Sequence, residues 1–121
     1  IPAGHPNYEV RRTDTLPVAV RLLSITPHMH LLGKEIRATA KLPNGTQRDL
    51  VWIRRWDYQW QETYRFREPE LLPKGTQIEL VARFNNSATN PLNPSRPPKR
   101  VSFGELTSDE MASVILEGVP E

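Results

Sequence analysis

The stretch EIRATAKLPNG (residues 35–45) alternates apolar and polar side chains and then ends in a turn signal. Its apolar members lie two residues apart, at Ile36, Ala38, Ala40 and Leu42. Alternation of this kind is typical of a β-strand that buries one face. Asn44-Gly45 is the residue pair most typical of a tight turn between antiparallel strands. We therefore expect a strand that leads into a β-hairpin at these residues.

Four other segments have the composition and alternation of strands. They are residues 16–25, 50–53, 64–67 and 78–84. A second turn signal lies at residues 72–76, which contain a proline and a glycine. The chain has 12 Pro residues, and proline disfavours helices. Short strands separated by turns about every 8–12 residues predict an antiparallel sandwich or barrel.

Three parts of the chain carry weaker patterns. Residues 1–15 are polar and contain proline, so we interpret them as an N-terminal arm. Residues 85–100 predict a long Asn/Pro/Ser loop, and residues 101–103 predict a short strand. Residues 107–116 are ambiguous, because their first four residues match a helix capping box whereas the apolar run at 114–116 favours a strand.

Composition indicates a single globular domain. The 121 residues include no Cys, which excludes a disulfide framework and a thiolate metal site. The formal net charge is +2, from 16 Lys and Arg scattered among 14 Asp and Glu, and this balance argues against nucleic-acid binding. No apolar run approaches the ~20 residues that span a membrane. The chain begins with Ile1 rather than Met, so we expect residues 1–121 to be one domain excised from a longer protein.

His28 and His30 are the first candidates for chemistry. Residues i and i+2 of a strand point to the same face, so the two imidazoles form a pair of metal ligands while Met29 points away. A third ligand must come from His5, from a carboxylate or from Met111. A third His or a carboxylate suits zinc or non-haem iron, whereas a thioether suits copper, especially Cu(I). The spacing alone predicts a metal without choosing it.

An aromatic segment offers a different interpretation. Residues 52–60 contain four aromatic side chains, Trp52, Trp56, Tyr58 and Trp60. Such a cluster can stack on a sugar or another flat ligand, or it can pack the core and edge of a sandwich. The second interpretation needs no ligand and is the simpler one. The first makes the chain a binding module whose histidines are incidental.

Two motifs, HMHLLGK (residues 28–34) and GELTSDEM (residues 104–111), carry a family resemblance. They resemble the His-x-His…Leu-Gly-Lys and Gly…Thr-Ser-Asp-Glu-Met segments of copper type II, ascorbate-dependent monooxygenases. That family includes peptidylglycine α-hydroxylating monooxygenase and dopamine β-monooxygenase. LPKGT (residues 72–76) and residues 85–90 also resemble its bacterial relatives. The resemblance covers almost the whole chain and is to the C-terminal of the family's two domains.

The resemblance implies an all-β fold, an antiparallel jelly-roll-like sandwich of about eight strands. It implies that His28, His30 and Met111 bind one copper ion, as Cu(I) or Cu(II), where O2 is activated and a substrate C–H bond is hydroxylated. In the family, a second copper is held by histidines of the N-terminal domain and passes on electrons from ascorbate. The resemblance also implies a periplasmic or extracellular location.

The sequence departs from the family at several positions. Ala112 stands where the family usually has Cys, and Thr26, Ser113 and Ile115 stand where the family has the Arg, Asn and Tyr that grip a peptide substrate. None of these three can grip a peptide in that way. His5 is the only spare histidine, so the chain cannot build the second copper site. Electrons must come from a companion domain or directly from ascorbate.

These observations lead to one principal hypothesis and two others. We expect the oxygen-activating copper domain of a monooxygenase, with an unknown small-molecule or peptide substrate. The missing partner site favours a second hypothesis, a non-catalytic copper-binding or copper-handling module of a larger redox protein. The aromatic segment favours the third, a ligand-binding sandwich without a metal.

Overall fold

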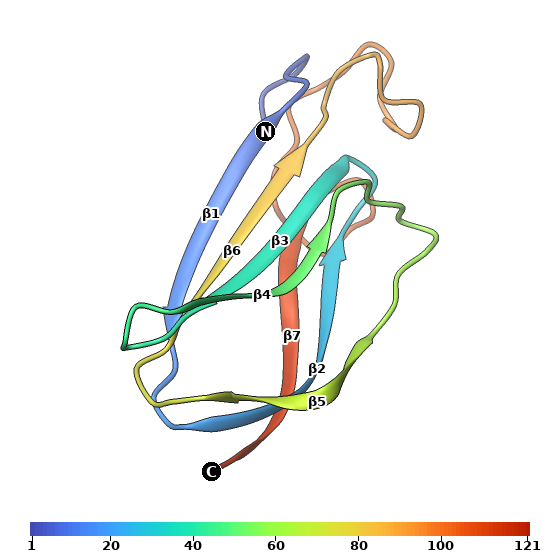
Figure 1. Ribbon diagram of the computed structural model, residues 1–121. Helices are drawn as coiled ribbons and strands as arrows, with labels where there is room; N and C mark the ends of the chain where they lie inside the picture. Colours follow the sequence, from blue (N-terminus) through green and yellow to red (C-terminus); the bar gives the residue numbers. More distant parts are fainter.

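The computed structural model describes residues 1–121 and is built of strands, with no helix. Seven antiparallel strands form two sheets (Figure 1), of order β1-β6-β3-β4 and β5-β2-β7. Their bounds are β1 Tyr8–Thr15, β2 Val20–Met29, β3 Gly33–Lys41, β4 Gln47–Ile53, β5 Tyr64–Leu72, β6 Gln77–Phe84 and β7 Ala112–Pro120. The expected all-β antiparallel sandwich is confirmed, with seven strands where about eight were expected. The structure has no helix that could cross a membrane.

The hairpin predicted at Asn44-Gly45 joins β3 to β4. Gly45 has a φ of 89°, a conformation that side chains with a Cβ rarely adopt. The Leu42 amide donates to the Thr46 carbonyl at 2.8 Å, and the Thr46 amide donates to the Asn44 side chain at 2.9 Å. The alternation that precedes this turn is also confirmed, because Ile36, Ala38 and Ala40 on β3 are fully buried.

The interpretation of residues 1–15 as an arm is wrong for their second half. Residues 8–15 form β1, which pairs with β6 from Tyr8 opposite Phe84 to Thr15 opposite Gln77. β1 is an edge strand, and most of its side chains are exposed. Its backbone bonds to β6 hold it in place, and such bonds leave no apolar pattern in the sequence.

Of the helix and the strand that the sequence allowed at residues 107–116, the structure contains the strand. No helix begins at residue 107, and β7 starts at Ala112 and pairs with β2. The short strand expected at residues 101–103 is reduced to a single bridge between Phe103 and Glu110. Residues 85–100 form the expected loop. The buried Asn86 side chain holds it by donating to the Lys99 carbonyl at 2.7 Å.

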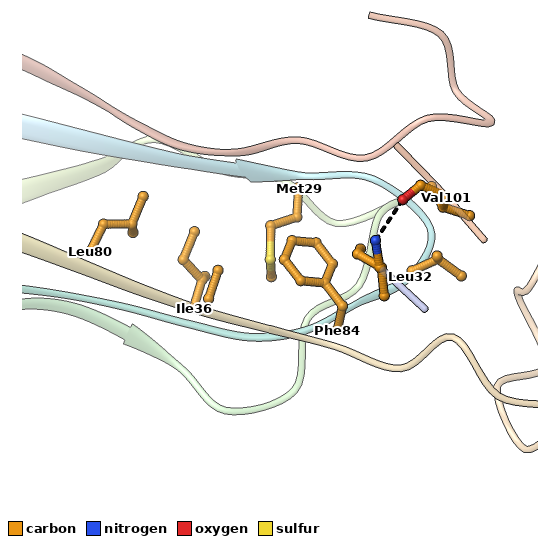
Figure 2. Packing of buried hydrophobic residues seen from close by; sticks show 8 residues of the cluster. Met29, Leu32, Ile36, Leu80, Phe84 and Val101 are labelled. Atoms are coloured by element: carbon orange, nitrogen blue, oxygen red, sulfur yellow. Dashed lines mark hydrogen bonds between the residues drawn. The ribbon is translucent and has the colours of Figure 1, made fainter. Parts of the chain in front are cut away.

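The core lies between the two sheets in two adjoining clusters. Figure 2 shows the first, in which Phe84 packs beside Met29 and Ile36. The second surrounds Leu22 and Ile25 of β2. Met29 is fully buried, as expected from the alternation. Because neighbouring residues of a strand face opposite ways, His28 and His30 are directed to the outer face of the β5-β2-β7 sheet.

Phe84 and Phe103 allow a matched test of this core. Their rings lie edge to face with centroids 5.7 Å apart, but Phe84 is fully buried whereas Phe103 is 50% exposed. We expect Phe84→Ala to lower the free energy of unfolding by about 3–5 kcal/mol, because it opens a cavity in the first cluster. Phe103→Ala should cost much less in urea denaturation. Equal losses in the two variants would contradict the core described here.

Candidate metal centre

The pairing of β2 with β7 brings the two motifs together. His28 lies opposite Ser113 and Met29 lies opposite Ala112. His30 and Met111 are the next residues beyond this last pair, and Glu110 accepts hydrogen bonds from the amides of both. Residues directly opposite each other in an antiparallel pair point to the same face. The register therefore directs His28 to the outer face together with Ser113, and it brings the backbone of His30 and Met111 to the same end of the sheet.

The two imidazoles are close neighbours. Their ring centroids lie 5.0 Å apart and the ring planes are nearly perpendicular, at 81°. His30 is only 5% exposed and His28 is half-buried. The Tyr58 ring also meets His30 edge to face, at 5.9 Å between centroids. The pair is therefore held by packing and lies at the boundary between core and solvent.

One backbone carbonyl fixes the tautomer of the neutral His30 ring. The Nδ1 atom of His30 lies 3.0 Å from the carbonyl oxygen of Asp109. A carbonyl oxygen only accepts, so Nδ1 must carry the hydrogen and donate it. The lone pair of the neutral ring is then on Nε2. A metal-ligating histidine is commonly oriented in this way, by a bond from its other nitrogen.

Gln61 fixes His28 in the same way. Its Oε1 atom lies 2.6 Å from Nδ1 of His28, and its Nε2 atom donates to the Tyr58 carbonyl at 2.9 Å. The second bond settles the orientation of the amide, since a carbonyl cannot bond to Oε1. Nδ1 of His28 therefore donates to Gln61, and Nε2 of His28 carries the lone pair. Sequence reasoning missed Gln61, because only the fold brings it to a histidine 33 residues away.

The buried Glu110 side chain ties the two motif segments together. Its Oε1 atom accepts from the His30 amide at 2.9 Å and from the Met111 amide at 3.3 Å, and its Oε2 atom accepts from the Leu32 amide at 2.9 Å. Burial raises the pKa of the Glu110 carboxyl, and the three amide hydrogen bonds act against that rise. The sequence placed this residue in a capping box, so its role was also missed.

The other proposed ligands lie elsewhere. His5 is exposed, and its Nδ1 accepts from the Asn7 amide at 3.2 Å. No group of three or more His, Cys, Asp or Glu side chains is arranged to hold a metal ion. Two histidines and one methionine do not make such a group, because methionine is not among those four residue types. Met111 lies just beyond the end of the β2–β7 pairing, whereas His5 lies in the N-terminal segment and bonds to the Asn7 amide.

The aromatic segment does not share one environment. The guanidinium groups of Arg37 and Arg54 each lie over the Trp52 ring, at 4.1 and 4.2 Å from its centroid. Trp56 packs against the first core cluster, and its buried Nε1 has no hydrogen-bond partner. Trp60 is exposed. These surroundings favour packing and edge roles for the aromatic residues over a single stacking platform.

A hollow of about 510 Å³ lies on the other sheet and is not the candidate centre. It is lined mainly by charged side chains, and its arginines are in ion pairs with carboxylates. Arg37 forms an ion pair with Asp49, and Arg83 forms one with Glu9, each with 2.7 Å between the guanidinium nitrogen and the carboxylate oxygen. Exposed pairs of this kind are common on solvated sheet faces and contribute ~0–1 kcal/mol each.

A scan against protein-family models and a search among curated proteins both found no match. The resemblance to copper monooxygenases therefore stays a prediction from the two motifs.

The tautomers of the histidines can be read by NMR without any metal. Long-range ¹H–¹⁵N spectra of the neutral imidazoles should show Nδ1 protonated in His28 and His30. His5 should show the reverse, because its Nδ1 accepts a hydrogen bond. Gln61→Leu removes the acceptor and should give His28 a population protonated on Nε2 while His30 stays unchanged. A proton on Nε2 of His28 in the unaltered chain would contradict the geometry.

Glu110→Gln tests the hydrogen bonds by which Glu110 joins the two motif segments. The amide group of glutamine places a donor against a backbone N–H, so one buried N–H loses its acceptor. We expect a loss of about 1–3 kcal/mol in the free energy of unfolding, measured in urea. The exposed Glu117, on the nearby strand β7, is the control, and Glu117→Gln should change stability far less. Similar effects of the two substitutions would show that Glu110 does not have this role.

Proposed function

We propose that the chain is the oxygen-activating copper domain of a copper-dependent monooxygenase, with His28, His30 and Met111 as the copper ligands. One observation carries the proposal. The two imidazoles lie side by side with Nδ1 of each engaged, which leaves both Nε2 lone pairs available, and Met111 is the residue just beyond the end of the β2–β7 pairing. Nothing in the sequence motifs themselves requires this engagement of Nδ1, so it supports the proposal independently.

The donor set fits copper. Two neutral imidazoles with a soft thioether, and without a thiolate, favour copper over zinc, and especially Cu(I). Copper bound there would supply the one-electron chemistry with O2 that hydroxylation of a C–H bond requires. The chain itself orients the ligands. The Asp109 carbonyl and the Gln61 amide direct the two lone pairs, and Glu110 holds the backbone of His30 and Met111.

The two β2–β7 pairs nearest to the histidines carry no charge, and Arg65 and Glu117 lie further along, opposite Ser24. His28 lies opposite Ser113, and Thr26 lies opposite Ile115, which is 63% exposed. The Thr26 hydroxyl is 2.8 Å from the Thr63 hydroxyl, so these two groups satisfy each other. A peptide carboxylate has no cation to bind in these two pairs. We therefore propose C–H hydroxylation without extending it to peptide amidation.

The proposal includes an external source of electrons. His5 is the only other histidine, and it lies apart from the pair. A companion domain or ascorbate would have to reduce the copper. We propose the periplasm or the extracellular space as the place of action, on the family resemblance alone.

A second candidate function is a non-catalytic copper-binding module. The observation that favours it is that the two β2–β7 pairs nearest to the histidines carry no cation that could bind a substrate carboxylate. The two functions differ in oxygen chemistry. A catalytic domain reduced with ascorbate should consume O2 once copper is bound, whereas a handling module should bind copper tightly and consume none.

Cu(I) titration of the unaltered chain and of three variants tests the copper site. We expect one equivalent to bind, and His28→Ala, His30→Ala and Met111→Ile each to lower the affinity more than about tenfold, or about 1.4 kcal/mol. Met111→Ile should keep the fold, because the two side chains have similar volume. His5→Ala is the control and should bind copper normally. Normal affinity in the three ligand variants would rule out the site.

A further inference from the structure

The two sheets contain unequal numbers of strands, four against three. Across the sandwich, β6 contacts β7 and β4 contacts β2. Since β1 lies outside β6 in its sheet, β1 extends beyond β7 and no strand lies opposite it. Figure 1 shows β1 at one side of the molecule, with β7 behind the middle of the other sheet.

The space beside β7 and under β1 is an open groove. It consists of two adjoining hollows of about 280 and about 270 Å³, which share Arg12, Leu80 and Ala112. The first is mainly apolar and is lined by Val10, Leu80, Ala82, Phe103 and Ala112 together with two arginines. Side chains of the sandwich interior are therefore accessible from this side.

The free edge of β7 is also the least protected edge of the molecule. Edge strands expose unpaired N–H and C=O groups, and proteins commonly guard them with charges or proline. The other three edge strands have such guards: Glu9, Arg11, Arg12 and Asp14 on β1, Arg48 and Asp49 on β4, and Arg65, Arg67, Glu68, Pro69 and Glu70 on β5. β7 has one charged residue, Glu117, and a proline only at its last position, Pro120, and it exposes Ile115 and Val119.

We propose that the edge of β7 and this groove bind one extended segment of a partner polypeptide, which adds to the β5-β2-β7 sheet as a further strand. Main-chain hydrogen bonds to β7 would supply affinity, and apolar side chains at alternate positions would pack on Val10 and Leu80. The groove follows β1 from Val10 to Asp14, about 13 Å, so the segment needs about five residues there.

Because β1 extends beyond β7, the edge of β7 has room for a single added strand but not for a second copy of the chain. Two copies joined edge to edge through β7 would each bring their own β6 opposite β7. The β6 strand of one copy would then occupy the place that β1 of the other copy already covers. A single strand avoids this collision, because it brings no second sheet with it. The inference does not depend on copper, since the groove opens beside the sandwich core and not on the face with the histidines.

A tethered strand tests the proposal. The chain is extended after Glu121 with an Asn-Gly turn and about ten residues that alternate Thr and Val, so that the added strand runs back along β7 at high local concentration. The matched control carries Pro in place of each Val, which removes backbone donors. We expect the Val extension to slow hydrogen exchange at β7 amides that point away from β2 by at least tenfold, and to raise the Tm.

Two results would overturn the proposal. The first is equal exchange at the β7 amides in the Val and Pro extensions, which would show that the edge does not accept a strand. The second is a dimer of the unextended chain, seen by sedimentation, that Ile115→Lys abolishes. That result would assign the β7 edge to a second copy. A monomer whose β7 amides are protected only by the Val extension supports a lone strand.

Discussion

The buried carboxylate of Glu110 is the interaction on which the candidate centre depends. It joins the end of β2 to the start of β7 by accepting the amides of His30, Leu32 and Met111. These groups lie where the two strands stop pairing, so no ladder bonds hold them. Burial raises the pKa of Glu110 because it disfavours the charged carboxylate. Three hydrogen bonds from backbone amides favour the carboxylate and so lower the pKa. The separation between His30 and Met111 is thereby fixed by the protein itself.

The two imidazoles are likewise held in place by hydrogen bonds to other segments of the chain. Each ring has its Nδ1 atom bonded to an acceptor that belongs to a different segment, Asp109 before β7 for His30 and Gln61 before β5 for His28. Tyr58 links these parts, because its ring meets His30 and its carbonyl orients Gln61. A ligand set prepared in this way loses little freedom when a metal binds, which is how supporting hydrogen bonds raise metal affinity.

The sequence predicted the parts of the fold that bury apolar side chains in alternation. The hairpin after Ile36 and Ala38, and the outward direction of His28 opposite to Met29, follow from a period of two. β1 was missed because only Tyr8 and Val10 of this strand pack on the core, and its backbone bonds leave no trace in the exposed Arg, Thr and Asp residues that follow. Gln61 and Glu110 could not be assigned, because their partners lie 33 and 80 residues away and are chosen by strand register.

X-ray absorption spectroscopy of the chain loaded with one equivalent of Cu(I) is the sharpest test of the proposed copper site, because it counts the atoms bound to the metal. We expect two imidazole nitrogens and one sulfur, with the sulfur from Met111, the residue just beyond the end of the β2–β7 pairing. The sulfur contribution should disappear in Met111→Ile while both imidazoles remain. A copper environment without sulfur, or one with a third imidazole from His5, would contradict this expectation.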